Sequence, residues 1–168
     1  MHQRVDYIIR NGRDLHIKIP QLDEWNTKKI ETIAYQLALH YKRRDLHELI
    51  AIAIKECTEN GIKANLKRLY FNQQNLDIHK EQDYYRGIAK FKERLKAENS
   101  LESFPVARQA GYLVLVDMSH HPKGITIDIT NNAGVSPIEA QRIRERYHKG
   151  KNNANFAEFL QDQIDPVE

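Results

Sequence analysis

Cysteine is scarce in this sequence, and long apolar runs are missing from it. The single cysteine, Cys57, cannot form a disulfide within the chain and is typical of proteins from a reducing compartment. No run of about 18 apolar residues occurs, so we expect no segment that spans a membrane. The first residues also lack the shape of a signal peptide. Together these absences predict a cytoplasmic protein.

The charge balance excludes few classes of protein. The formal net charge of +3 is mild, and by itself it indicates neither a nucleic-acid nor a membrane partner. An apolar fraction of 40% and a charged fraction of 29% are typical of a soluble globular protein and not of a disordered one. A length of 168 residues is enough for one domain with a hydrophobic core. We therefore expect a single domain over residues 1–168.

The apolar pattern predicts both strands and helices. Leu15–Ile19 alternates between apolar and polar residues, which predicts a half-buried strand. Trp25–Tyr41 has helical periodicity, and either Asn26 or Asp23 is its expected cap. Tyr112–Asp117 is almost entirely apolar, which predicts a strand buried on both faces. We expect the strands of the sheet near residues 14–19, 66–71, 112–118 and 124–130, and a further helix over residues 78–97.

The central stretch of the chain is Leu46–Phe71. Its periodicity predicts a long helix, capped by Asp45, that is followed by a short strand. Glu56 and Asn60 lie four residues apart and therefore on one face of this helix. A carboxylate and a carboxamide so placed suit a hydrated divalent cation such as Mg²⁺ together with an anion; a solvated glutamate and a helix-terminal asparagine are the alternative. The expected buried stripe consists of Leu46, Leu49, Ile50, Ala53, Ile54, Cys57 and Gly61.

Residues 129–137, with the sequence ITNNAGVSP, connect the last expected strand to a helix. Ser136 is the predicted N-cap, Pro137 the first helical residue, and Glu139 lies in the first turn. The asparagines fit an ordinary turn as well as a ligand-binding segment. Cations make the end of this helix strongly basic, which the helix dipole favours with or without a ligand. These cations are Arg142, Arg144, Arg146, Lys149 and Lys151.

Two segments, in the right order, resemble motifs of the GHKL superfamily, which includes gyrase and the histidine kinases and shares the Bergerat ATP-binding fold. The sequence ECTENGIKANLKRLYF resembles the N-box of that superfamily, with Glu56, Asn60 and Lys63 at the motif positions. The sequence ITNNAGVSP resembles its G1 box, a strand that ends in Asp-Asn-Gly-X-Gly-Ile-Pro. Aligning the prolines of the two sequences places Asn131 on the motif aspartate, Asn132 on its asparagine and Ala133 on its first glycine.

The resemblance implies an α/β (α+β) fold, a two-layer sandwich in which helices cover one face of a mixed sheet. It also implies a histidine-kinase-like ATPase domain in a signalling protein, with ATP and Mg²⁺ as cofactors. In that domain Asn60 would hold Mg²⁺, Glu56 would orient or activate the attacking group, and Lys63 would neutralise phosphate. Asn131 would read adenine, with Asn132 and Ala133 beside it in the nucleotide site. The expected domain is incomplete at its C-terminus, because no GxGxG box follows the G1 segment.

The sequence also departs from the superfamily pattern. Ala133 and Val135 add a Cβ where the motif has glycine, and Asn131 is a weaker acceptor than a carboxylate. The expected helix over residues 78–97 is an addition and offers a surface for a partner. A non-catalytic interaction module on the same fold, with a protein partner or a second copy, is therefore an alternative. A nucleic-acid binder that uses the basic helix is a weaker one, because aromatic residues do not alternate with its cations.

Overall fold

The computed structural model describes residues 2–97, 103–121 and 124–152. Helices and a small sheet make up this part of the chain, which confirms the α+β class expected from the sequence. In chain order the elements are α1 (His2–Arg10), β1 (Leu15–Ile19), α2 (Glu24–His40), the 3₁₀ turn η1 (Arg44–Leu46), α3 (His47–Gln73), α4 (Glu81–Ala97), α5 (Ser103–Gln109), β2 (Val114–His121), β3 (Gly124–Asn131) and α6 (Pro137–Asn152).

The sheet has three strands in the order β1-β2-β3, and both pairs are antiparallel. Ile17 lies opposite Val116, which in turn lies opposite Ile129. The expectation of a mixed sheet is therefore wrong for the described residues. The expected strand at 66–71 is also wrong, because these residues belong to α3. The strands expected near 14–19, 112–118 and 124–130 are confirmed, although β2 continues to His121.

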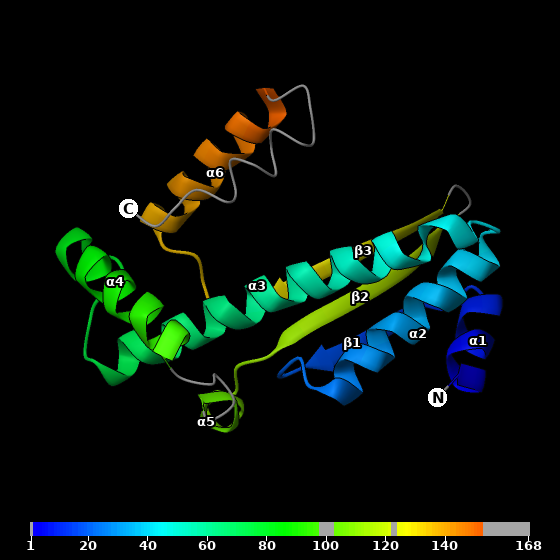
Figure 1. Cartoon of the computed structure of the whole chain (residues 1–168), viewed down its shortest axis with the longest axis horizontal. Helices are drawn as coiled ribbons and strands as arrows, with labels where there is room; N and C mark the ends of the chain where they lie inside the picture. Colours follow the sequence, from blue (N-terminus) through cyan, green and yellow to red (C-terminus); the bar gives the residue numbers. More distant parts are fainter. Residues whose placement is uncertain (1, 98–102, 122–123, 153–168) are drawn as a thin grey trace.

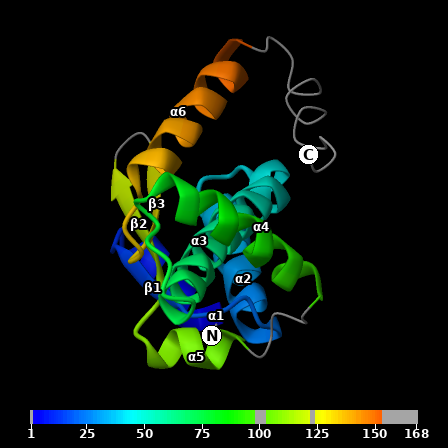
Figure 2. The same ribbon diagram turned by 90° about the vertical axis from the view of Figure 1, so that its left-hand side faces the viewer.

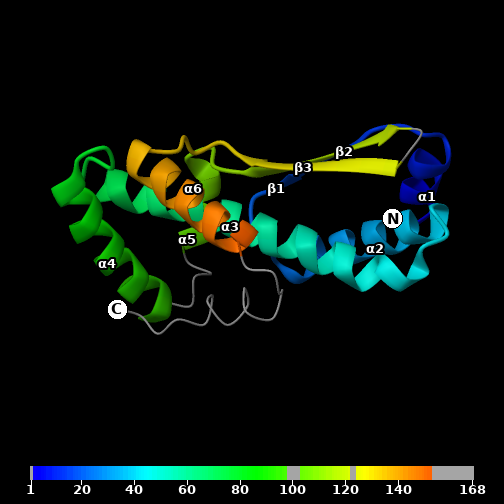
Figure 3. The same ribbon diagram turned by 90° about the horizontal axis from the view of Figure 1, so that it is seen from above.

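The strands and helices form two layers, and Figure 3 shows α1, α2 and α3 together on one face of the sheet. On that face Ile17, Val114, Val116 and Met118 are buried. The opposite face is polar, and there the His16 and Asp117 side chains lie 2.7 Å apart on neighbouring strands. The sequence predicted that Tyr112–Asp117 is buried on both faces. This prediction is wrong, because only every second side chain of the strand points toward the helices.

The helix α3 is 27 residues long and runs along the whole molecule (Figure 1). It continues through residues 66–71 because Ile62, Leu66 and Tyr70 recur every four residues and are all buried. Near its C-terminal end it packs on α4, where the ring centroids of Tyr70 and Phe91 lie 5.7 Å apart. Apolar contacts along a helical period thus override the β propensity of this segment.

The buried side of α3 differs from the expected stripe. Ile54 is buried as predicted, but Leu49 is 61% exposed and Cys57 is exposed as well. Thr58 and Asn65 take buried positions instead. An apolar pattern cannot identify a buried stripe that includes polar side chains. The predicted stripe is therefore rotated about the helix axis relative to the side of α3 that is buried.

The N-termini of two helices test the predicted caps. Asp23 caps α2, since its carboxylate accepts a hydrogen bond of 2.8 Å from the backbone N–H of Asn26. This hydrogen bond is the main cause that lowers the pKa of Asp23. Asp45 does not cap α3, whose N-terminus has no side-chain cap; it forms an ion pair with Arg43 instead.

The helices that follow α3 lie toward the end of that helix far from α1, whereas β2 and β3 run back along it. Figures 1 and 2 show α4 and α6 beside α3 there, with the end of β3 leading into α6. The helix predicted over residues 78–97 is confirmed as α4, and the predicted start of α6 at Pro137 is confirmed too. In the described part of the chain, no helix combines the length and the apolar character needed to cross a membrane.

Candidate functional site: a cationic groove between three helices

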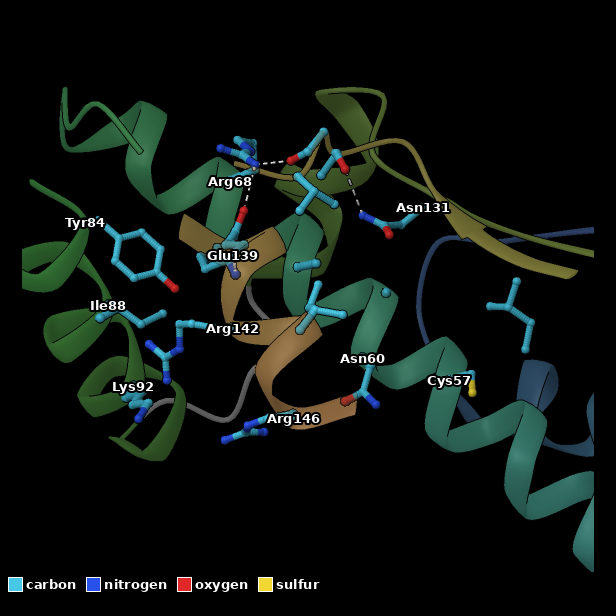
Figure 4. A pocket seen from close by; sticks show the side chains of 18 residues that line it. Cys57, Asn60, Arg68, Tyr84, Ile88, Lys92, Asn131, Glu139, Arg142 and Arg146 are labelled. Atoms are coloured by element: carbon cyan, nitrogen blue, oxygen red, sulfur yellow. Dashed lines mark hydrogen bonds and ion pairs between the residues drawn. The ribbon is translucent and has the colours of Figure 1, made fainter. Parts of the chain in front are cut away.

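A groove of about 530 Å³ lies between α3, α4, α6 and the segment that connects β3 to α6 (Figure 4). The residues that line it come from three stretches of the chain that are separate in the sequence, 57–68, 84–92 and 129–146. Three of the predicted site residues, Asn60, Asn131 and Ala133, lie on its walls. The fold thus brings the N-box-like and G1-like segments to one cavity.

Asn131 lies at the end of β3, where its side chain is held in one orientation. Its amide nitrogen donates to the side-chain oxygen of Asn65 at 3.2 Å and to the carbonyl of Ala133 at 3.3 Å. Both hydrogen atoms of that nitrogen are therefore used. Among the described residues no hydrogen bond occupies the side-chain oxygen of Asn131, which leaves an acceptor at the groove.

Asn65 is a residue of this region that the sequence reasoning missed. It is 3% exposed, and its amide nitrogen donates to the carbonyl of Leu113 at 3.1 Å. Because it also accepts from Asn131, it ties α3 to the beginning of β2 and to the end of β3. The sequence signal that could have identified Asn65 was its position in the N-box-like segment, directly after Lys63 and Ala64.

The helix α3 approaches the sheet closely at Gly61. A Cβ atom on Gly61 would lie 2.9 Å from Val114 Cγ2 and 3.5 Å from the Cβ of Asn131. The first of these distances is shorter than a carbon–carbon contact allows. The missing side chain therefore lets the groove floor form between the helix and the strands.

Glu56, Lys63 and Asn132 are placed outside the groove. Glu56 is exposed one turn before Asn60. Lys63 is exposed and pairs with Glu59 at 2.7 Å. Both ends of the Asn132 amide bind backbone: its oxygen accepts from the N–H of Leu113 at 3.0 Å, and its nitrogen donates to the carbonyl of Gly111 at 2.7 Å.

Ser136 and Glu139 form a reciprocal cap at the N-terminus of α6. The carboxylate of Glu139 accepts from the backbone N–H of Ser136 at 2.9 Å, and the Ser136 hydroxyl accepts from the N–H of Glu139 at 3.3 Å. Glu139 is also the partner of Lys67 and Arg68 on α3, and Arg68 donates to the carbonyl of Gly134. This cluster joins α6 to α3.

The carboxyl of Glu139 is ionised in this cluster. Burial alone would raise its pKa, but the ammonium of Lys67 and the backbone N–H of Ser136 stabilise the charged form and hold the pKa below its ordinary value. The carboxylate is therefore already engaged by two cations and the helix N-terminus. It is not a free ligand for a metal ion.

Three further cations line the groove, Lys92 from α4 and Arg142 and Arg146 from α6. Figure 4 shows Arg142 directed toward α4, where Lys92 and Ile88 lie, and Arg146 extending away from Asn60 toward the side of Lys92. Within the described residues no ion pair engages any of the three. Lys92 was not predicted as a site residue, and its spacing from Ile88 and Tyr84 on one helix face is the only sequence signal for it.

The groove can bind an anion but offers little to a free metal ion. Its cations outnumber its one carboxylate, and field lines concentrate in such a concave, positively charged surface. Within the described part of the chain, no group of three or more histidine, cysteine, aspartate or glutamate side chains could hold a metal. Amide oxygens and cations are the groups that this groove offers to a ligand.

Comparison with known proteins identifies a relative of this chain. The chain is 32% identical over 121 residues to an uncharacterized protein of Treponema pallidum (strain Nichols), and the match covers 72% of this chain. It covers 23% of the relative, so the chain spans about a quarter of the protein it matches. No family model and no solved structure matches the chain.

Proposed function

We propose that this chain is a GHKL-type domain that binds ATP with Mg²⁺ and belongs to a histidine-kinase-like signalling protein. One observation carries the proposal: Asn60 and Asn131, from the two segments that resemble the N-box and the G1 box, line one cationic groove. Asn60 and Asn131 are far apart in the sequence. A chance resemblance of two short segments gives no reason for them to meet at one cavity.

The polarity of the groove favours a nucleotide. The free side-chain oxygen of Asn131 can accept a hydrogen bond from the amino group of adenine, and the cations of α4 and α6 can neutralise phosphates. The layout, with helices on one face of a sheet and the ligand near the end of a strand, is compatible with a Bergerat-like fold. The departures are the antiparallel three-stranded sheet and the added helix α4.

The oxygen ligands of the groove suit Mg²⁺ only when the phosphates also bind the ion. Asn60 supplies one amide oxygen at the groove, and Glu139 is engaged by Lys67 and Arg68. Mg²⁺ commonly keeps several waters and takes its remaining oxygens from carboxylates and substrate phosphates. We therefore expect Asn60 to hold a Mg²⁺ ion that enters with the nucleotide, where the ion would neutralise phosphate charge.

The remaining motif residues have peripheral roles in this proposal. Glu56 lies one turn from Asn60 on the exposed side of α3, where it could orient an attacking group without contributing to affinity. Lys63 faces solvent with Glu59, so its help to the phosphates requires that ion pair to open. Asn132 positions the G1-like segment by binding Leu113 and Gly111.

Calorimetric titration with ATP, with and without Mg²⁺, tests the proposal. Wild type should bind ATP more tightly when Mg²⁺ is present, and Asn60→Ala should lose most of that Mg²⁺-dependent gain. Gln73→Ala is the matched control, because Gln73 is an exposed amide on the same helix that does not line the groove. Absence of ATP binding by the wild-type chain would overturn the nucleotide proposal.

An interaction module on the same fold is the second candidate function. The observation that favours it is a pair of large apolar side chains on the outer side of α3, Leu49 at 61% and Ile52 at 57% exposure. A homodimer or a protein partner that covers them would bury apolar area that water now contacts. Light scattering on the wild type and on Leu49→Gln, Ile52→Gln would show a loss of self-association in the double variant if α3 is a dimer interface.

A further inference from the structure

The helix α4 contributes one wall of the groove, although it lies outside both motif-like segments. Tyr84, Ile88 and Lys92 follow one another at intervals of four residues and all line the cavity. Tyr84 is 3% exposed and packs on Phe71, so this part of α4 is anchored to α3. Lys92 lies on the same face of α4, one turn after Ile88, and its side chain is exposed at the groove.

The opposite wall presents cations at the same spacing. Arg142 and Arg146 are four residues apart on α6 and both line the groove. The neighbouring cations Lys67 and Arg68 share the carboxylate of Glu139, whereas the described residues provide no such partner for the two arginines or for Lys92. Three positive charges therefore face one cavity from two helices, and an anion placed between them relieves their mutual repulsion.

We propose that Lys92, Arg142 and Arg146 form a polyphosphate-binding subsite, so that α4 is part of the ligand site. The inference rests on the proposed function, and it assigns the phosphate end of the nucleotide to this side of the groove. The adenine end then lies toward Asn131, across the cavity (Figure 4). The two guanidinium groups can each bind two phosphate oxygens, and the ammonium of Lys92 acts as a point charge.

A compact polyphosphate fits these observations better than a nucleic acid does. The cations converge on a concave cavity from two helices, whereas a nucleic-acid backbone needs cations spread along an open surface. The cavity of about 530 Å³ is also within the size range of small-molecule pockets. The ligand class we assign is therefore a di- or triphosphate carried on a nucleoside.

The test uses three probes on the full chain, namely ATP, inorganic tripolyphosphate and adenosine, at low ionic strength. Lys92→Gln and Arg142→Gln should each weaken the binding of ATP and of tripolyphosphate by roughly three- to tenfold, because each removes one positive charge from an exposed site. Adenosine binding should stay unchanged, since it carries no phosphate. The four side chains that these variants and their controls replace are all exposed, so circular dichroism and the unfolding midpoint should match wild type.

Matched controls lie on the same two helices. Lys90→Gln and Arg144→Gln remove the same charges from exposed positions of α4 and α6 that do not line the groove. They should bind all three probes as wild type does. An equal loss of affinity in Lys90→Gln and Lys92→Gln would overturn the subsite, because the loss would then follow from the overall charge of the protein and not from the position of Lys92.

The outcomes separate this inference from the proposed function. Tight ATP binding that is the same in wild type, Lys92→Gln and Arg142→Gln would overturn the subsite while the nucleotide proposal stands. Binding of tripolyphosphate that depends on Lys92, with no gain from the adenosine part of ATP, would support the subsite and overturn the assignment to ATP. Binding of none of the probes would overturn both.

Discussion

At the scale of single residues, polar side chains at buried positions determine how α3 sits in the molecule. Thr58 is fully buried, and within the described residues its hydroxyl has no hydrogen-bond partner. Asn65 is also buried, but both ends of its amide are used. The two residues thus differ in energetic effect: an unpaired buried hydroxyl costs free energy, whereas a paired amide orients its neighbours.

We predict that Thr58→Val raises the free energy of unfolding by about 1 kcal/mol, because it removes an unpaired polar atom while keeping the side-chain shape. Urea unfolding of both proteins measures the change. Thr32→Val is the matched control, since Thr32 is 4% exposed but its hydroxyl donates to the carbonyl of Lys28 at 2.8 Å. A loss of stability in Thr58→Val equal to that in Thr32→Val would contradict the prediction.

Glu139 makes stability depend on pH. Its pKa is lower in the folded state than in the unfolded chain, so its contribution is fully present above the unfolded value near 4.5 and is lost as the pH falls through the folded value. At pH 7, Glu139→Gln should destabilise the protein by about 2 kcal/mol because it leaves Lys67 and Arg68 without their shared anion. Unfolding midpoints between pH 7 and 3 should converge for the two proteins as the pH falls.

At the scale of elements, two glycines set how closely helices approach their neighbours. Gly61 faces the sheet, and Gly87 on α4 faces Phe71, where an added Cβ would lie 2.4 Å from the ring. Phe71 is 1% exposed and therefore has little room to move. Glycine is normally unfavourable inside a helix, so its presence at both positions reflects packing and not helix formation.

We predict that Gly61→Ala and Gly87→Ala each lower the free energy of unfolding by about 1–3 kcal/mol, because overpacking outweighs the gain in helix propensity. Gly87→Ala should have the larger effect, since its clash is closer. Thermal unfolding measures both. Ala53→Gly on the exposed side of α3 is the control for propensity alone, and it should cost about 1 kcal/mol. Stabilisation by either alanine would show that the helices can move apart.

At the scale of the whole molecule, the sequence predicted the α+β class and the strands whose outer face meets solvent. Alternation identifies such strands, as in Leu15–Ile19, because each second residue points to water. It failed at residues 66–71, where a short apolar run fits a strand and a buried helix equally well, and the contacts of Tyr70 with α4 decide between them. These contacts come from distant parts of the chain, which a local pattern does not report.

The candidate site was predictable to a similar extent. Asn60 and Asn131 were found because they occur in motif-like segments, and they do line one groove. Asn65 was missed because its partner Leu113 is 48 residues away, and Lys92 because it lies on a helix that the superfamily pattern lacks. The role of a polar residue that acts through a distant partner becomes visible only when the fold brings the two together.

The cluster around Glu139 has a consequence for local opening. Glu139, through its ion pairs with Lys67 and Arg68, and the partly buried Ile138 hold α6 in place, whereas many buried apolar side chains join the sheet to α2. We expect α6 to detach while the sheet stays folded, so its amide protons should exchange with deuterium faster than those buried in α3. ATP or tripolyphosphate should slow exchange in α6 first, and Glu139→Gln should speed it there alone. A wall that opens by itself lets a ligand enter and leave without unfolding the rest of the molecule.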